Sequence, residues 1–559
     1  MNYPVLALLV FATATTAVVF ARLTGRFALA ATAGGALILY LHGAVYYGYT
    51  SDDAYISYRY ARHLGDGIGL VWNPGQYVEG YSNFLWVLLL AGLHAAGADI
   101  VWSGRWLGFA AGVATMGATY MLVRELLDRS DLARYAGLAA AFALAASGPF
   151  ALWSYAGLET PLFALLVSMA VLLHLREQRI GTFPASGAVW ALAARTRPDA
   201  LVLVVVAAFF KLSDLILAES SEHTDERTHI TRRTCAIWLG TFAVIFVPYF
   251  IWRFATYGWL FPNAYYAKVG GGFEQYERGI RYLAQFAQEY AAWLVLLAPV
   301  ALLLRGCRRP GIAYVLALVA VWCVYVVYVG GDALLRFRFF AEILPLFYAL
   351  IAASIAAIIG AVRIDSPRAT TLRYVAGAMV ATGLIAFTLQ STPNERFAVA
   401  VPFESAAVDD RVEIGRWLRA NAPEDTSIAV LAAGAIPYES RLETIDMLGL
   451  NDEHIAHRPI RIGSSDAAAG HEKYDSAYVL SLHPDAIILF DGLAGGPAGR
   501  SEYESLSNSI TPAFAEMVTT PQLWLDYEAQ SVEIREGRWF NLLVRRGSPL
   551  TESVRSAAP

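Results

Sequence analysis

Two adjacent carboxylates, Asp52 and Asp53, follow the second long apolar run and open the polar segment 50–104. Two like charges at a membrane boundary repel each other and lose hydration, so at least one should have a raised pKa or a cationic or hydroxyl partner. A carboxylate held in this way can accept a proton from an incoming hydroxyl group. The alternative is that one of them only caps the helix that follows, because aspartate is a preferred N-cap residue.

Several basic side chains lie at the ends of apolar runs on the same predicted side as this pair, against the trend of the other basic residues. They are Arg195, Arg197, Lys268, Arg336 and Arg338. Guanidinium groups match phosphate oxygens, so several of them converging would suit a lipid phosphate. For any single arginine, pairing with Asp199, Asp332 or Glu342, or extension to the headgroups, is an equally good explanation.

The segment 65–86 is rich in glycine and aromatic residues. Its Gly-x-Gly-x-Gly pattern is not a dinucleotide-binding loop, because no strand precedes it. Trp72, Tyr77, Tyr81 and Trp86 suit sugar stacking or anchoring at headgroup level equally well.

The composition indicates that the elements which position these residues lie in a membrane. The chain has 559 residues, of which 57% are hydrophobic and 16% charged, with a mean hydropathy of +0.45. Soluble domains are about 45–50% apolar and about 25% charged, so a soluble protein is excluded. The net charge of −5 and the absence of a basic stripe exclude nucleic acid as a partner. Cys235, Cys307 and Cys323 have neither a paired nor a metal-ligand spacing.

About ten apolar runs are long enough to cross a bilayer. They cover residues 5–21, 27–49, 105–123, 135–153, 159–176, 235–254, 286–304, 311–329, 341–361 and 374–390. The run 185–216 is interrupted by Arg195–Asp199 and predicts two short helices that meet at a polar apex, which raises the total to about twelve spans. Residues 83–97 predict an interfacial helix.

Arginine placement predicts the direction of these spans. Alternate short loops hold most of the basic residues, which marks them as cytoplasmic in a multi-pass plasma-membrane protein. The segments 50–104, 255–285 and 330–340 should therefore be extracytoplasmic, as should the chain after residue 391. We predict a helical catalytic membrane domain over 1–391 and an extracytoplasmic α/β domain over 392–559. Its elements include a helix at 412–420 and strands at 427–432 and 486–490.

Five short motifs occur in a fixed order. They are Asp-Asp-Ala-Tyr-Ile-Ser at 52–57, Asn-Pro-Gly-x-x-Val-Glu-Gly-Tyr at 73–81, Gly-Leu-Glu-Thr at 157–160, Pro-Asn-Ala-Tyr-Tyr-Ala-Lys at 262–268 and Gly-Gly-Asp at 330–332. Together they resemble the GT-C superfamily of polyprenyl-phosphate-dependent membrane glycosyltransferases, and within it the terminal arabinofuranosyltransferases of the mycobacterial cell wall. The chain departs from the arabinosyl relatives at Leu334-Leu335-Arg336, where a Met-His-Gly-like run is expected.

The resemblance implies an enzyme that moves a sugar, with arabinofuranose as the candidate, from a polyprenyl-phosphate donor to a hydroxyl of a cell-envelope glycan or glycoconjugate. By this match Asp52 or Asp53 is the base. The five basic residues named above hold the phosphate, while Glu159 and Asp332 orient sugar hydroxyls. Arg59, Tyr81 and Asn263, which lie in or beside the motifs, complete the substrate-binding candidates.

No cofactor is expected, because arginine and lysine can stabilise the departing phosphate without a metal. A divalent cation at Asp52 and Asp53 stays open as an alternative. A metal site at His454 and His457 is less expected, since the pair has no clear third ligand.

The competing function from another class is a transporter or flippase for lipid-linked sugars. It predicts inverted repeats and charges near the middle of the membrane, and the sequence shows neither. A non-catalytic assembly protein would not need a carboxylate pair opposite several arginines.

Overall fold

The computed structural model describes residues 3–46, 48–220, 231–270, 272–304, 310–361, 367–390, 395–459, 470–507 and 511–557. The chain divides into two compact units. We call Met1–Tyr47, Gly104–Trp252 and Gly279–Val399 the helical unit. We call Gly48–Ser103, Arg253–Arg278 and Ala400–Pro559 the sheet unit.

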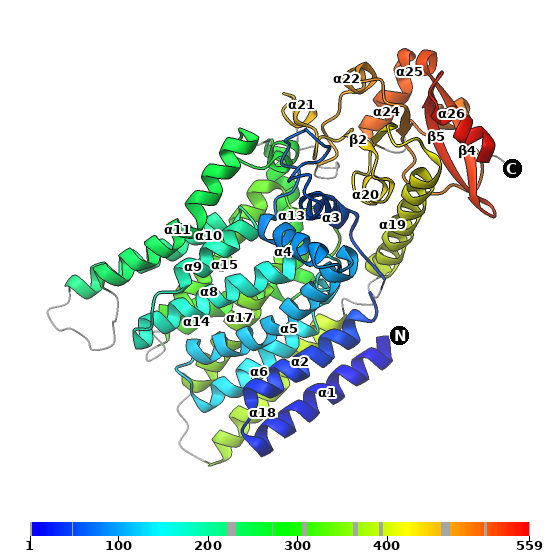
Figure 1. The fold of residues 1–559 in the computed structure, drawn as a ribbon. Helices are drawn as coiled ribbons and strands as arrows, with labels where there is room; N and C mark the ends of the chain where they lie inside the picture. Colours follow the sequence, from blue (N-terminus) through cyan, green and yellow to red (C-terminus); the bar gives the residue numbers. More distant parts are fainter. Residues whose placement is uncertain are drawn as a thin grey trace. The chain divides into compact units, whose positions relative to one another are not determined.

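In the described residues, seven helices are long and apolar enough to cross a membrane (Figure 1). They are α1 (Tyr3–Thr24), α5 (Ile100–Leu126), α8 (Thr160–Ile180), α10 (Ala200–Ser220), α11 (Arg232–Tyr257), α15 (Pro310–Val329) and α17 (Leu344–Ala361). The bent pair formed by α13 (Phe273–Glu289) and the segment Ala292–Leu303, which contains η1 (Ala292–Leu296) and α14 (Leu297–Leu303), adds an eighth if it is one span.

The remaining helices outside the C-terminal region include the shorter apolar segments Phe27–Gly43, Phe84–Ala95 and Gly377–Gln390. They are α2 (Phe27–Gly43), α3 (Asp52–Gly65), α4 (Phe84–Ala95), α6 (Asp131–Ala145), α7 (Gly148–Trp153), α9 (Ser186–Thr196), α12 (Asn263–Lys268), α16 (Arg338–Ala341) and α18 (Pro367–Gln390). The helix predicted over 83–97 is α4, and the break predicted within 185–216 lies between α9 and α10. Helix α10 is longer than the short helix that the sequence predicts.

Local backbone breaks explain why some of the apolar runs do not form one full-length helix. The run 135–153 is divided between α6 and α7, and Pro149 stands in the first turn of α7. The run 286–304 bends by 90°. Ala291 has a φ of +53° at this bend, a left-handed conformation that interrupts a helix.

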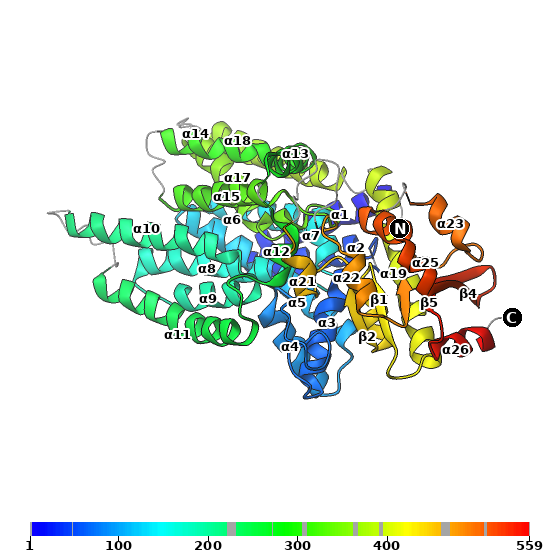
Figure 2. The same cartoon turned by 90° about the horizontal axis from the view of Figure 1, so that it is seen from above.

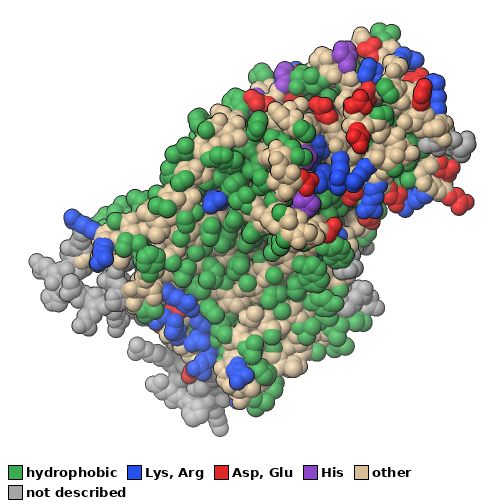
Figure 3. Space-filling model, in the orientation of Figure 1, with side chains coloured by type: hydrophobic (Ala, Val, Ile, Leu, Met, Phe, Trp, Pro, Cys, Tyr) green, Lys and Arg blue, Asp and Glu red, His purple; other side chains and the backbone are tan. Residues whose placement is uncertain are grey.

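The helical unit exposes the apolar surface that a bilayer requires. Hydrophobic side chains cover the helices of this unit on the face drawn in Figure 3. Val244 in α11 is 75% exposed and Leu303 in α14 is 84% exposed. In Figure 2, helices α8, α9, α10 and α11 lie beside one another. Continuous exposed apolar surface on long helices identifies the chain as a membrane protein.

The sheet unit contains a five-stranded mixed sheet in the order β2-β1-β3-β5-β4. Its strands are β1 (Ser427–Val430), β2 (Glu443–Asp446), β3 (Ala486–Ile488), β4 (Tyr527–Arg535) and β5 (Arg538–Arg545). Strands β2, β1 and β3 are parallel, whereas β5 is antiparallel to both β3 and β4. Its core includes Ala429, Ile487, Phe514 and Leu543.

Helices flank this sheet. They are α19 (Glu395–Asn421), α20 (Ala435–Ser440), α21 (Glu453–Ala456), α22 (Ser476–Ser481), α23 (Arg500–Ser505), α24 (Pro512–Thr519), α25 (Pro521–Asp526) and α26 (Leu550–Ala557). The predicted strands at 427–432 and 486–490 are confirmed as β1 and β3, and the predicted helix at 412–420 lies within α19. The boundary predicted between residues 391 and 392 stays a prediction. The sheet unit also takes in the segments 48–103 and 253–278.

Segment 48–103 is tied to the sheet by buried polar contacts. The indole of Trp72 donates to the Thr444 carbonyl at 2.9 Å, and the Asn73 side chain bonds both the amide and the carbonyl of Thr444. Thr444 lies in β2, so these contacts anchor the loop that follows α3 to the edge strand of the sheet. Buried polar groups satisfied in this way specify one arrangement of the chain.

His63 in α3 gives the sheet unit a pH-dependent stability. Burial lowers the pKa of His63 to about 4, and its Nδ1 lies 2.9 Å from the Val71 carbonyl oxygen. Because the ordinary pKa in the unfolded chain is near 6.5, the stabilisation is full above that pH. It is lost as the pH falls toward 4, by up to about 3 kcal/mol. Thermal unfolding of the purified protein between pH 7.5 and 4.5 should show this loss.

The variant His63→Gln should have a flatter pH profile over that range. His483→Asn is the matched control, since His483 is exposed and asparagine tolerates its φ of +50°. Equal slopes for the wild type and His63→Gln would contradict the assignment.

Candidate functional site

Two backbone amides bind the two carboxylate oxygens of Asp52. Ser51, not Asp52, is the N-cap residue of α3, so the capping alternative is wrong. The amide of Gly434 donates to Oδ2 at 3.1 Å, and the amide of Ala435 donates to Oδ1 at 3.0 Å. Arg411 Nη1 lies 3.7 Å from Oδ1, and the Asp52 side chain is only 16% exposed. Asp52 therefore connects α3 to the loop that leads into α20.

The close approach of this loop depends on glycine. A Cβ atom at Gly434 would collide with the carbonyl and the carboxylate of Asp52. Burial raises the pKa of Asp52 above its ordinary value, while Arg411 and the amide of Ala435 oppose that rise. The geometry therefore gives Asp52 a structural anchoring position.

Asp53 has a different environment, although it is the next residue. Its Oδ2 lies 4.0 Å from Nζ of Lys268, with the Asp53 side chain 29% exposed and that of Lys268 28% exposed. Lys268 ends α12, and its stem runs close to the backbone of Gly470. A hydroxyl group can thus reach Asp53 from solvent while a cation stands beside it.

The structure adds two charged residues of α19 that the sequence interpretation missed. Arg411 Nε lies 3.1 Å from Asp491, so the guanidinium links the Asp52 and Asp491 carboxylates. Burial raises the pKa of the Glu404 carboxyl, and the negative charge of Asp52 contributes to the rise. The residues after 391 are predicted to form a separate domain, and charges on one helix resemble an ordinary solvated face, so the sequence holds no signal that distinguishes these two residues.

Arg59 was predicted to bind substrate, but the structure places it inside the sheet unit. Its side chain is buried, and its guanidinium donates to the carbonyls of Trp72 at 2.9 Å, Pro437 at 2.6 Å and Leu442 at 2.9 Å. A fourth bond reaches Asn73 Oδ1 at 2.9 Å. An arginine whose donors are used in this way supports the backbone around it.

Asn263 and Tyr81, two further substrate-binding candidates, are also buried. Nδ2 of Asn263 donates to the carbonyls of Gly449 at 2.9 Å and Leu450 at 3.1 Å. The hydroxyl of Tyr81 lies 3.1 Å from that of Tyr257. Both side chains therefore hold loops of the sheet unit together.

In the helical unit, Arg197 is surrounded by carboxylates. Its nitrogens lie 2.8 Å from Glu159, 2.7 Å from Asp199 and 2.9 Å from Glu342, and its side chain is 8% exposed. Tyr325 donates a hydrogen bond to Asp199 at 3.1 Å. These three carboxylates occupy the guanidinium. Arg197 is therefore poorly placed for the phosphate-binding role that the sequence predicts.

The other predicted residues of the helical unit have mixed environments. Arg338 Nε lies 2.7 Å from Asp332, and both side chains are at most 9% exposed. The guanidinium of Arg336 lies 5.3 Å from the ring of Tyr46, and that of Arg195 lies 5.4 Å from a tyrosine ring in α11. Of the phosphate ligands predicted in the helical unit, Arg197 and Arg338 are thus engaged by carboxylates of the protein.

Metal ligation receives no support among the residues that the structure describes, which contain no group of three His, Cys, Asp or Glu able to hold an ion. His454 pairs with Asp475 at 3.0 Å, whereas the ring of His457 stacks on Trp259 with centroids 3.7 Å apart. Cys235 and Cys323 form no disulfide within the described part of the chain, and Cys307 lies outside it.

Residues 403–542 match a family model described as a domain of unknown function, DUF8728. No curated protein matches the chain.

Solved structures show the fold. The chain is similar to ArnT from Cupriavidus metallidurans bound to undecaprenyl phosphate, with a TM-score of 0.55 and 12% identity over 94% of this chain and 98% of that one. The apo state of ArnT gives a TM-score of 0.52, with 13% identity and the same coverage. The oligosaccharyltransferase AglB from Archaeoglobus fulgidus gives a TM-score of 0.48, with 11% identity over 93% of this chain and 77% of that one. The likeness to ArnT confirms the GT-C prediction at the level of fold: the chain is a helical membrane protein of GT-C fold with a small C-terminal sheet domain.

Proposed function

We propose that this protein is an integral-membrane glycosyltransferase that moves a sugar from a polyprenyl-phosphate donor to a hydroxyl acceptor. One observation carries the proposal: the partly exposed Asp53 carboxylate faces Lys268 at 4.0 Å. The fold supports it, since ArnT, similar over 94% of the chain, was solved with undecaprenyl phosphate bound. A carboxylate beside a cation provides the base and the anion stabiliser that such a transfer needs.

The transfer would proceed as a single displacement. Asp53 accepts the proton of the acceptor hydroxyl while the hydroxyl oxygen forms a bond to the anomeric carbon of the sugar. The bond between that carbon and the phosphate oxygen breaks, and its electron pair leaves with the polyprenyl phosphate. Lys268 stabilises the negative charge that develops on the departing phosphate.

Two arginines of the helical unit that were predicted to hold the phosphate belong instead to ion pairs. We assign Arg197 and Arg338 to structural ion pairs with the carboxylates that they contact, while Arg195 and Arg336 stay predicted donor contacts. Glu159 and Asp332 remain the candidates for orienting sugar hydroxyls. A carboxylate offers about four acceptor sites, so an ion pair with arginine leaves some available.

Arabinofuranose is the first donor sugar to test, because the ordered motifs resemble the arabinofuranosyltransferases. The acceptor we propose is a cell-envelope glycan or glycoconjugate. The reaction would take place on the extracytoplasmic side of the plasma membrane, as the arginine distribution predicts.

The test is an assay of purified protein with a panel of polyprenyl-phosphate sugars and a mixed cell-wall glycan extract. Acceptor-dependent release of polyprenyl phosphate from one donor is expected. Lys268→Met should raise the donor KM by about 10- to 100-fold, the usual value of a charge-assisted contact, while Lys268→Arg retains part of the affinity. Arg419→Met, which removes an exposed cation of α19, is the matched control.

Two outcomes would contradict the proposal. The first is the absence of acceptor-dependent release from every donor in the panel. The second is movement of labelled donor across sealed vesicles without any transfer, which would support the transporter alternative.

A further inference from the structure

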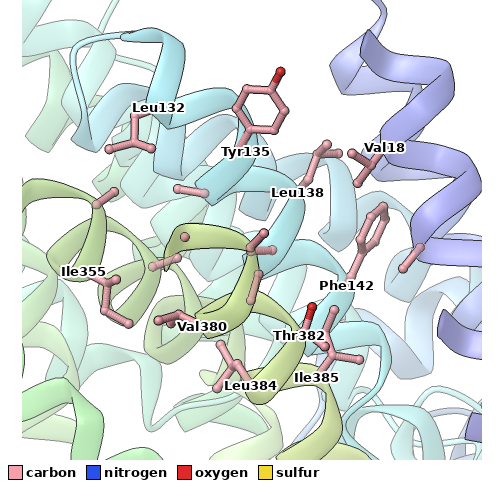
Figure 4. Close-up of a pocket in the computed structure, with 18 of the residues that line it drawn as sticks. Val18, Leu132, Tyr135, Leu138, Phe142, Ile355, Val380, Thr382, Leu384 and Ile385 are labelled. Carbon is pink, nitrogen blue, oxygen red and sulfur yellow. The ribbon is translucent and has the colours of Figure 1, made fainter. Parts of the chain in front are cut away.

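An apolar cavity of about 750 Å³ lies within the helical unit among α1, α6, α17 and α18 (Figure 4). Val18 of α1, Leu138 and Phe142 of α6, Ile355 of α17 and Leu384 of α18 line it. Its size is that of pockets that hold small ligands, about 300–1,000 Å³. It contains none of the residues assigned above to sugar transfer.

The cavity exists because small side chains stand where these helices face each other. Helix α1 packs along α2, while α18 packs on α6 and α17, so α1 and α18 form opposite walls. Ala14, Ala139 and Ala356 are among the lining residues. Alanine leaves the space between the walls open, and an apolar space at this position is suited to a hydrocarbon chain.

One end of the cavity is cationic. Arg22, near the end of α1, lines the cavity together with Tyr135, near the start of α6. Tyr135 packs edge-on against Phe27 with ring centroids 5.4 Å apart, and the guanidinium of Arg134 lies 5.6 Å from the Phe27 ring. Arg26 directly precedes Phe27, so three arginines gather near this end.

Among the described residues, the carboxylates near this cationic end leave part of its positive charge unpaired. Arg134 pairs with Asp131 at 3.4 Å, where both side chains are exposed. Within the described part of the chain, neither Arg22 nor Arg26 has a carboxylate partner. The Arg22 guanidinium at one end of an apolar cavity is complementary to an amphipathic anion.

We propose that this cavity binds an anionic phospholipid of the bilayer, with an acyl chain between α1 and α18 and the phosphate at Arg22. Basic pockets between membrane helices bind anionic lipid headgroups by this combination of charge and apolar contact. The sequence predicts Arg22 and Arg26 on the cytoplasmic side and Asp53 on the opposite side. A phospholipid of the cytoplasmic leaflet is therefore the occupant, and the sugar donor is not.

The test compares lipids on delipidated full-length protein in detergent. Native mass spectrometry and the shift in Tm would be recorded during titration with phosphatidylglycerol and with phosphatidylcholine. Wild-type protein should prefer phosphatidylglycerol at least about fivefold, and Arg22→Gln should remove that preference. Ala139→Phe, which fills the cavity, should weaken both lipids about tenfold.

The matched control is Arg233→Gln, which removes an exposed arginine of α11 that does not line the cavity. It should bind phosphatidylglycerol as the wild type does. Equal affinity of wild-type protein for the two lipids would overturn the proposal, as would equal behaviour of Arg22→Gln and Arg233→Gln. Displacement of the bound lipid by polyprenyl phosphate at equal concentration would also overturn it, because the cavity would then be a donor site.

Discussion

Asp53→Asn should lower acceptor-dependent sugar transfer by about 10²- to 10⁴-fold, the range that a general base contributes. The amide of asparagine has nearly the size of the carboxylate but cannot accept the hydroxyl proton. Asp53 is 29% exposed, and among the described residues it pairs with Lys268 alone, at 4.0 Å, so loss of its charge should barely change the fold. The measurement is kcat at saturating donor, from release of polyprenyl phosphate, together with the Tm of the variant.

Asp52→Asn should instead lower the stability of the protein more than its activity. Asparagine can accept only one of the two amide bonds from Gly434 and Ala435, and it loses the charge near Arg411. Leaving a buried amide unsatisfied costs about 1–3 kcal/mol, so the variant should lose stability and only part of its activity.

Asp66→Asn is the control for these variants, because Asp66 caps the other end of α3 and its side chain is 44% exposed. An Asp53→Asn enzyme that retains wild-type kcat would sink the assignment. If Asp52→Asn alone abolished turnover at unchanged Tm, Asp52 would be the base.

The distinction between these two aspartates could not be made from the sequence. Adjacent residues at the start of a helix point in different directions, and which one meets the loop at Gly434 depends on tertiary contacts nearly 400 positions away. The sequence indicated that at least one of the pair would have a raised pKa or a cationic or hydroxyl partner. It named Lys268 only as a phosphate ligand, although the structure places it beside Asp53, and it missed Arg411, because nothing in a helix of mixed charge marks one arginine as buried.

The helical architecture was more predictable than the roles of its arginines. Long apolar runs have few alternatives to membrane helices, and the polar Arg195–Asp199 break between α9 and α10 was visible as an interruption of such a run. A bend of 90° after α13 left no comparable signal, since Ala291 is an ordinary residue in an unusual conformation. The role of Arg59 could not be predicted either. An arginine in a motif that donates to backbone carbonyls looks the same in the sequence as one that binds substrate.

Arg197→Met should destabilise the helical unit by about 3–5 kcal/mol, the usual cost of removing one partner from a buried ion pair. Arg197 is the shared partner of Glu159, Asp199 and Glu342, whose side chains are at most 7% exposed. Methionine preserves the apolar stem but leaves three carboxylates without this cation. The expected result is a large fall in Tm and in the monodisperse fraction after purification.

A second substitution separates this structural role from phosphate binding. Glu342→Gln removes one of the three negative charges, so Arg197→Met combined with Glu342→Gln should recover part of the stability lost by Arg197→Met alone. Arg197→Lys should fall between the wild type and Arg197→Met, because a single ammonium group cannot reach three carboxylates in a guanidinium geometry. A well-folded Arg197→Met protein with wild-type Tm and a raised donor KM would instead make Arg197 a phosphate ligand. The rescue distinguishes the two roles. Removing one carboxylate should restore stability to Arg197→Met only if Arg197 balances the charge of buried carboxylates.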